Sequence, residues 1–278
     1  MSDKMKNFIV RGLSGIVMFA VLVGATLLSK LTFALLLLAI TLGGEWEFYR
    51  LAKKSGAAPQ RGIGLLAGGL LVMAAAAILY EIGAVTALAL ALFLVLIPMP
   101  FVFELYRKSP TPMANVGITY AGVIYVALPM TLLMFFPLML GNGEWQPWSV
   151  LFYVFIIWAN DVFAYLFGIT LGKHRLFERI SPKKSWEGFF GGLLGAMVMG
   201  FVAAKVLDAN VAMWIGLALI AAITGVFGDL VESLLKRSVD VKDSGNIIPG
   251  HGGWLDRFDA LVYSVPFAFL YLAIIEII

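Results

Sequence analysis

Long apolar segments dominate the chain, and short polar segments separate them. Stretches of mostly apolar residues lie at 10–29, 31–44, 62–80, 83–103, 117–140, 149–170, 188–207, 211–228 and 260–278. A helix needs about 20 such residues to cross the hydrocarbon core of a bilayer. The pattern therefore predicts an all-α, polytopic integral membrane bundle of about nine transmembrane helices. Because the short second segment forms either a hairpin with the first or one bent element, the expected range is eight to ten.

The composition supports lipid as the solvent for much of the surface. The chain is 61% hydrophobic and 13% charged, with a mean hydropathy of +0.94, whereas soluble domains carry about 25% charged residues. It has no cysteine, which excludes disulfides, thiolate metal sites and cysteine nucleophiles. The basic start is interpreted as part of a retained first helix and not as a signal peptide. Residues 1–150 are expected to form N-terminal and middle transmembrane helices, and 151–278 a C-terminal catalytic region.

The basic residues predict which side each connection faces. If the N-terminus is cytoplasmic, nine helices place all 20 lysines and arginines except Lys30 and Lys205 at the cytoplasmic side. This bias is what the positive-inside rule expects. The C-terminus is then outside, and the two long polar connections, near 171–187 and 229–259, face the cytoplasm.

The connection 229–259 is rich in carboxylates. Asp229, Glu232 and Lys236 have i, i+3, i+7 spacing and would share one helix face. Asp256 and Asp259 open the last helix after a glycine-rich turn. Carboxylates on two elements at one membrane surface suit a hard cation such as Mg²⁺, and basic neighbours suit the phosphates that it would bridge. The alternative interpretation is a solvated, salt-bridged loop.

The segment 158–188 carries a second set of polar residues. Asp161 lies inside an apolar segment, where an ionisable residue indicates function, or alternatively a hydrogen bond or ion pair between helices. Ser185 is a candidate N-cap for the next helix, whose N-terminus favours an anion. Lys183 and Lys184 would strengthen the attraction for phosphate, or else anchor the chain to lipid headgroups. His251, beside glycines, is more typical of a hydrogen-bonding turn than of a metal ligand.

The polar residues from 233 to 259 follow the order S-x-x-K-R, K-D, H-G-G and D-R-x-D. Together with Asn160-Asp161 and the segment Ser181-Pro-Lys-Lys-Ser185-Trp-Glu-Gly, this order resembles the phosphatidate cytidylyltransferase (CDP-diacylglycerol synthase) family. Trp254 stands where an aliphatic residue is expected, which leaves the polar positions intact. The resemblance is specific over 158–259 and general in character over 1–150.

The resemblance implies a reaction of phospholipid biosynthesis at the inner (cytoplasmic) membrane, in which CTP and phosphatidic acid give CDP-diacylglycerol and pyrophosphate. It also implies Mg²⁺, a second, monovalent cation such as K⁺, and a homodimer, but no nucleic-acid partner. The implied metal ligands are Asp229 and Asp256, with Asp259 supporting. The implied catalytic residues are Asp229, Asp256, Lys236 and Arg237. The implied substrate-binding residues are Asp161, Lys173, Lys183, Lys184, Ser185, Ser233, Lys242, His251, Gly252, Gly253 and Arg257.

Two other functions fit parts of the pattern. A CTP-dependent lipid kinase acting on a polyprenol or phytol would share the polytopic plan and charged inner connections, and its product from CTP would distinguish it. The complete H-G-G-x-x-D-R-x-D segment favours the cytidylyltransferase. A cation-coupled transporter would use Asp161 as its coupling site and contain discontinuous helices near the bilayer midplane. The charges at one interface and the lack of an inverted repeat disfavour it.

Overall fold

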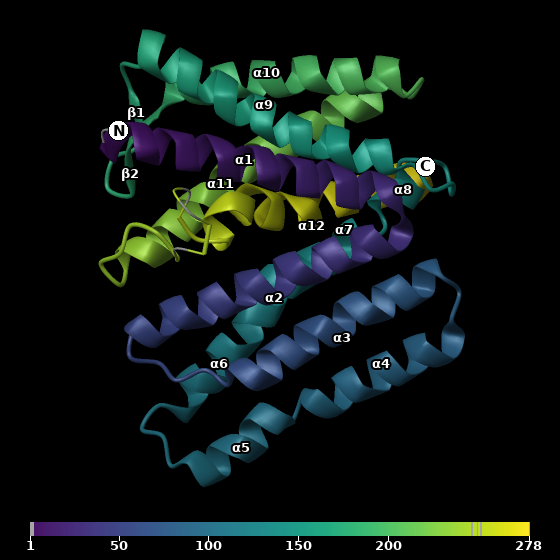
Figure 1. The fold of residues 1–278 in the computed structure, drawn as a ribbon, viewed down its shortest axis with the longest axis vertical. Coiled ribbons are helices and arrows are strands. Elements are labelled where there is room, and N and C mark those ends of the chain that lie inside the picture. The colour runs from purple at the N-terminus through teal and green to yellow at the C-terminus, as the bar shows by residue number, and fades with distance from the viewer. Residues whose placement is uncertain (1–2, 246, 249, 251, 278) are drawn as a thin grey trace. The chain divides into compact units, whose positions relative to one another are not determined.

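The computed structural model describes residues 3–245, 247–248, 250 and 252–277 (Figure 1). Within them, nine helical segments are long and apolar enough to cross a membrane, which confirms the predicted all-α, multi-pass class. These segments are Val10–Leu28, Lys30–Lys54, Arg61–Leu79, Gly83–Arg107, Pro112–Met139, Pro147–Leu171, Trp186–Val206, Val211–Arg237 and Leu255–Ile277.

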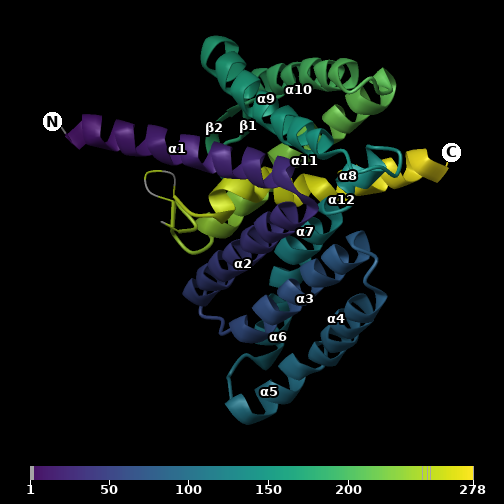
Figure 2. The same ribbon diagram turned by 45° about the vertical axis from the view of Figure 1, so that its right-hand side comes forward.

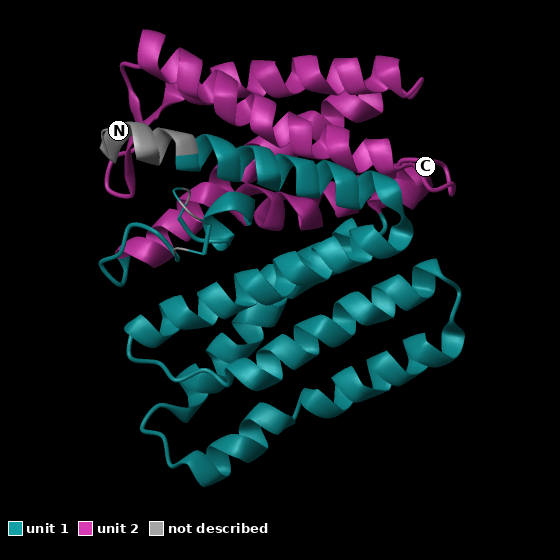
Figure 3. Ribbon diagram, in the orientation of Figure 1, with its two compact units in different colours: residues 1–135, 238–258 teal, residues 136–237, 259–278 magenta. Residues whose placement is uncertain are grey.

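The chain packs into two compact units, which Figure 3 shows in different colours. Unit 1 comprises Met1–Phe135 and Ser238–Phe258, and unit 2 comprises Phe136–Arg237 and Asp259–Ile278. The last connection and the first turn of the last helix therefore belong to unit 1, while the chain on either side belongs to unit 2. The expected boundary at residue 150 separates the catalytic region from the preceding helices, whereas these two units are defined by which residues pack together.

Unit 1 is built from the N-terminal helices. They are α1 (Asp3–Leu28), α2 (Lys30–Lys54), α3 (Arg61–Leu79), α4 (Gly83–Leu96), α5 (Met99–Arg107), α6 (Pro112–Gly122), the π-helical turn η1 (Val123–Ala127) and α7 (Leu128–Leu133). Ser29 caps α2 and exchanges hydrogen bonds with Thr32, so α1 and α2 form a hairpin and not one bent element. Helix α3 lies between α2 and α4, as both ribbon views show (Figures 1 and 2).

Helix α2 is longer than its apolar stretch. The sequence predicted an end near residue 44, and this was wrong, since the helix continues to Lys54. Glu45, Glu47 and Tyr49 in the additional turns are all fully buried. The hydroxyl of Tyr49 donates to the carbonyl of Thr119 on α6 at 2.7 Å. The helix therefore continues through these polar residues because unit 1 buries their side chains.

Unit 2 is built around three long helices. Its elements are α8 (Phe136–Met139), α9 (Pro147–Leu171), β1 (Arg175–Phe177), β2 (Ser181–Ser185), α10 (Trp186–Val206), α11 (Val211–Arg237) and the part of α12 (Leu255–Ile277) from Asp259 onward. Helix α10 packs against both α9 and α11. A Cβ built at Gly195 would lie 2.5 Å from the ring of Phe163, and Gly191 and Gly192 are similarly crowded by α9. These glycines permit the close packing that the sequence predicted.

The two polar connections contain more regular structure than their composition indicates. Helix α11 runs to Arg237 and α12 begins at Leu255, so the connection predicted over 229–259 is a loop only between residues 238 and 254. Both helices include charged residues beyond their apolar stretches, because helical backbone hydrogen bonds form with polar residues as well as with apolar ones. The connection 171–187 folds as an antiparallel hairpin of β1 and β2, with Arg175 opposite Ser185.

Candidate functional site

Three aspartates from separate helices of unit 2 lie near one another. Asp161 projects from α9, Asp229 from α11 and Asp259 from α12. The charge of Asp259 interacts with those of Asp229 and Asp161, and the charge of Asp161 interacts with that of Asp229. The Nζ atom of Lys184, on β2, lies 2.5 Å from Oδ2 of Asp229. The structure therefore brings together four of the residues that the sequence singled out.

A buried ion pair adjoins this group. On α11, Nζ of Lys236 lies 2.6 Å from Oε2 of Glu232, and Glu232 is fully buried. The charge of Lys236 also interacts with that of Asp259. We refer to Asp161, Asp229, Glu232, Asp259, Lys184 and Lys236 as the carboxylate cluster. It contains four acidic and two basic side chains, so two acidic groups have no basic counterpart within the cluster.

The orientation of Asp229 is fixed from two sides. Ser233, one turn later on α11, donates to Oδ1 of Asp229 at 3.2 Å, while Lys184 binds Oδ2. Asp229 nevertheless keeps 42% of its side chain exposed. Ser233, predicted to bind substrate, thus contacts Asp229, which remains accessible to a ligand.

The β-hairpin joins the cluster to the start of α10. Ser185 accepts a hydrogen bond from the backbone N–H of Gly188 at 3.1 Å, which confirms the predicted N-cap. The hairpin strand β2 that ends at Ser185 also carries Lys184. The cap therefore fixes the backbone next to the lysine that binds Asp229.

Glu187 closes the same hairpin, a role that the sequence analysis did not assign. Its carboxylate accepts hydrogen bonds from the backbone N–H groups of Lys173 and His174, and Nδ1 of His174 lies 2.6 Å from Oε1 of Glu187. The only sequence signal was its place within the motif Ser181–Gly188. The exposed side chains of Lys173 and Lys183 extend from the hairpin that Glu187 stabilises.

In unit 1, Asp256 organises the start of α12. Its carboxylate accepts hydrogen bonds from the backbone N–H groups of Ser244 at 3.0 Å and Gly253 at 2.7 Å. Gly252 has a φ of +86°, a left-handed conformation that glycine adopts without strain. Asp256 is therefore held at the helix N-terminus, where a negative charge is stabilised.

Glu47 contacts the same segment from α2, and the sequence analysis missed it. Its Oε2 atom accepts hydrogen bonds from the hydroxyl of Ser244 at 2.9 Å and from the backbone N–H of Leu255 at 2.8 Å. The predicted helix stopped near residue 44, so Glu47 was placed in a solvated connection. The available signal was an acidic residue directly after an apolar stretch, which is weaker than the position of Asp161 inside an apolar segment.

The remaining predicted residues differ in their exposure. The side chains of Lys173, Lys183, Arg237, Lys242 and Arg257 are exposed, that of Asp259 is half-buried, and Gly253 is buried. His251 lies outside the described residues. Asp256 belongs to unit 1, and Asp229 and Asp259 belong to unit 2, so the joint use of these aspartates as metal ligands stays a prediction.

The candidate site has the ligand atoms that a hard cation prefers, but its described side chains are not arranged as a metal-binding group. Within the described part of the chain, no three Asp, Glu or His side chains form a metal-binding group. Both oxygens of Asp229 are engaged by Ser233 and Lys184. However, carboxylate oxygens are the ligands that Mg²⁺ prefers, and the carboxylate cluster contains two more acidic than basic side chains.

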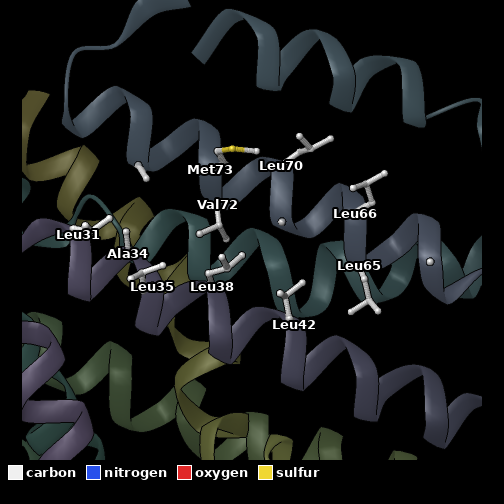
Figure 4. A pocket seen from close by; sticks show the side chains of 13 residues that line it. Leu31, Ala34, Leu35, Leu38, Leu42, Leu65, Leu66, Leu70, Val72 and Met73 are labelled. Atoms are coloured by element: carbon white, nitrogen blue, oxygen red, sulfur yellow. The ribbon is translucent and has the colours of Figure 1, made fainter. Parts of the chain in front are cut away.

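An apolar groove in unit 1 is separate from these charged residues. It lies between α2 and α3, has a volume of about 590 Å³, and is lined by side chains such as Leu35, Leu38, Leu66 and Met73 (Figure 4). Its lining includes no charged or hydrogen-bonding side chain. The groove therefore offers nothing that would bind a phosphate, and we place no polar chemistry there.

Comparison with known proteins agrees with the motifs. Residues 9–275 match the model of the cytidylyltransferase family. The chain belongs to this family. Proteins named phosphatidate cytidylyltransferase from Staphylococcus saprophyticus, Staphylococcus aureus and Staphylococcus epidermidis are 46%, 47% and 45% identical to it over 119 residues. Each alignment covers 42% of this chain and 46% of the relative, so the chain spans about half the length of the curated relatives it matches.

Proposed function

We propose that the protein is a phosphatidate cytidylyltransferase, which converts CTP and phosphatidic acid into CDP-diacylglycerol and pyrophosphate. The observation that carries the proposal is the match to the cytidylyltransferase family over residues 9–275. The names of the staphylococcal relatives supply the substrate. The carboxylate cluster and the lysines of the β1–β2 hairpin supply groups that suit a reaction between two phosphate compounds.

The reaction needs charge neutralisation more than it needs a covalent nucleophile. An oxygen of the phosphatidate phosphate attacks the α-phosphorus of CTP, and the bond to the oxygen that bridges the α- and β-phosphates breaks. Pyrophosphate leaves with that electron pair. The attacking phosphate is already ionised, so no dedicated general base is required. Positioned cations then lower the barrier by stabilising the charge that develops on the phosphate oxygens.

The basic residues divide into two groups by their surroundings. Lys184 and Lys236 lie within the carboxylate cluster, where their ammonium positions are fixed by ion pairs. Lys173, Lys183 and Arg237 are exposed and would hold the phosphates of CTP or of the lipid. Fixed charges in a partly buried site act more strongly on phosphate than exposed ones do.

Magnesium is part of the proposal. Asp229 and Asp256 would be its main ligands, with Asp259 supporting, and when bound the ion would neutralise charge on the phosphates. The excess of acidic over basic side chains in the carboxylate cluster supports this assignment. The second, monovalent cation such as K⁺ and the homodimer that the family resemblance implies belong to the same proposal.

The protein is a multi-pass membrane protein, and its bacterial relatives indicate the plasma membrane. We further propose that the polar residues of the site face the cytoplasm. The distribution of lysine and arginine supports this side, and so does the chemistry, because CTP arrives from the cytosol and phosphatidate from the membrane plane.

One assay tests the proposed function. The protein is purified in detergent and supplied with phosphatidic acid and labelled CTP, with and without Mg²⁺. Metal-dependent formation of CDP-diacylglycerol and pyrophosphate is the expected result. Transfer of phosphate from CTP to a prenol, with release of CDP, would replace the proposal by the lipid kinase. No product with any lipid acceptor would favour the transporter.

A further inference from the structure

A buried carboxylate on α2 holds the segment that carries Asp256. Glu47 is fully buried, and its Oε2 atom accepts hydrogen bonds from the Ser244 hydroxyl and the Leu255 N–H. Leu255 is the first residue of α12, so its N–H has no partner within that helix. An acidic residue inside a membrane-spanning helix is costly and indicates a function.

The contact continues from Glu47 to Asp256 through Ser244. The hydroxyl of Ser244 donates to Glu47 at 2.9 Å, and the backbone N–H of Ser244 donates to Asp256 at 3.0 Å. Both acceptors also bind N–H groups at the start of α12, namely those of Leu255 and Gly253. Ser244 therefore links the two carboxylates, and moving one of them disturbs the hydrogen bonds of the other.

Two glycines make the approach of Glu47 possible. A side chain at Gly245 would collide with Oε1 of Glu47, and a Cβ at Gly253 would lie 2.5 Å from Oε2. Oε1 has no hydrogen-bond partner in the described part of the chain and is buried against this backbone. The glycines thus let the backbone at Gly245 and Gly253 lie directly against the carboxylate.

We propose that Glu47 is a positioning residue, which holds Asp256 in place through Ser244 and the first turn of α12. The proposal deepens the function proposed above and rests on it for the role of Asp256. Glu47 itself contacts no reacting atom. Its contribution is to order Ser244 and the residues from Gly253 to Asp256 before any ligand arrives.

Amide hydrogen exchange of the full-length protein in detergent tests the ordering directly. Glu47→Ala removes the oxygen that accepts from the Ser244 hydroxyl and the Leu255 N–H, so we expect the amides of Ser244, Gly253 and Leu255 to exchange at least tenfold faster than in the unmodified protein. Glu47→Gln retains one carboxamide oxygen for both donors, and we expect it to preserve most of the protection. Ser244→Ala, which loses only the hydroxyl link, should lie between the two.

Glu45 offers a matched control. It is a fully buried glutamate on the same helix, and its carboxylate makes no hydrogen bond within the described residues. Glu45→Ala should leave exchange of the 244–256 segment unchanged. Equal protection of this segment in folded Glu47→Ala protein would overturn the proposal. Equal loss in Glu47→Gln and Glu47→Ala would also overturn it, because acceptor geometry would then not be the cause.

Activity provides a second measurement that separates this inference from the proposed function. In Glu47→Ala we expect a kcat for CDP-diacylglycerol formation at least tenfold lower, with recovery in Glu47→Gln and a smaller change in the KM for CTP. If the unmodified protein forms no CDP-diacylglycerol, the proposed function fails while the exchange result stands. If activity is present and the exchange of residues 244–256 is unaffected, the positioning role fails alone.

Discussion

The ammonium group of Lys184 and the carboxylate of Asp229 meet at 2.5 Å, although they come from a β-hairpin and from a long helix. Ser233 binds the other oxygen of the same carboxylate. Asp229 is thus oriented by two partners and remains partly exposed, an arrangement that suits a residue exchanging one cationic partner for another.

Asp229→Asn tests this position. The amide has the shape of the acid but loses its charge, so the pairing with Lys184 and the attraction for a divalent cation weaken together. We expect CDP-diacylglycerol formation to fall by about 10²-fold or more, while the variant stays folded and inserted. Asp208→Asn is the control, because Asp208 is exposed at a φ of +51°, a conformation that asparagine accepts. Near-normal turnover in Asp229→Asn would remove this residue from the site.

Asp256→Asn separates the structural role of Asp256 from its proposed role toward magnesium. An asparagine oxygen still accepts hydrogen bonds from Ser244 and Gly253, so the segment should remain ordered. The loss of charge should abolish activity at ordinary Mg²⁺ concentrations, with partial recovery when Mg²⁺ is raised. A magnesium titration of product formation measures this effect. Asp240→Asn, at an exposed turn with a φ of +54°, should titrate like the unmodified protein, and identical curves for Asp256→Asn would contradict the metal assignment.

Gly253→Ala tests the close packing around Glu47. The added Cβ would lie 2.5 Å from both Oε2 of Glu47 and the backbone nitrogen of Gly245. Because backbone atoms cannot rotate away, the segment must shift, at a cost of about 1–3 kcal/mol. We expect a lower thermal midpoint and a large loss of activity. Gly117→Ala, with no atom within 4 Å of the added methyl group, should change neither measurement, and a fully active Gly253→Ala protein would show that the packing is looser than described.

Tyr153→Phe tests a buried hydrogen bond that holds α9 to α12 in unit 2. The hydroxyl of Tyr153 donates to Oγ of Ser264 at 2.8 Å, and both side chains are fully buried. Hydrogen bonds between membrane helices contribute about 0.6–1 kcal/mol, so we expect the free energy of unfolding in detergent to fall by that amount. Tyr165→Phe, exposed on α9, serves as the comparison, and equal effects of the two substitutions would argue against the bond.

The absence of cysteine makes the proposed sidedness simple to test. Single cysteines are introduced at Glu178, in the β-hairpin, and at Asn142, in the turn before α9. In intact cells, a membrane-impermeant maleimide should label the cysteine at 142 and should label that at 178 only after the membrane is opened. The unmodified chain, which has no cysteine, is the background control. The reverse pattern would place the polar residues of the site outside.

Features determined by short stretches of sequence were predicted well. The membrane-spanning segments follow from uninterrupted apolar length, and the N-cap at Ser185 follows from its place before an apolar helix. The motif from Ser233 to Asp259 identified the family, because residue type and spacing remain visible without a structure. Asp161, judged only by its apolar surroundings, proved to interact with Asp229 and Lys184.

Features that depend on distant residues were not predicted. The end of α2 was placed too early because Glu45 and Glu47 look like the start of a solvated loop, and only the tertiary packing explains their burial. The link from Glu47 to Ser244 joins residues 197 positions apart. The spacing of residues along the chain does not predict a contact over such a distance. The pairing of Lys184 with Asp229 was missed for the same reason.

The separation between Glu47 and Ser244 also has a consequence for biosynthesis. A ribosome adds about 5–20 residues per second, so Glu47 is made on the order of 10–40 seconds before the residues that bind it. During that interval the final partners of the Glu47 carboxylate do not yet exist. A chain halted before residue 244 would lack these partners, so we expect it to be a preferred target for quality-control proteolysis.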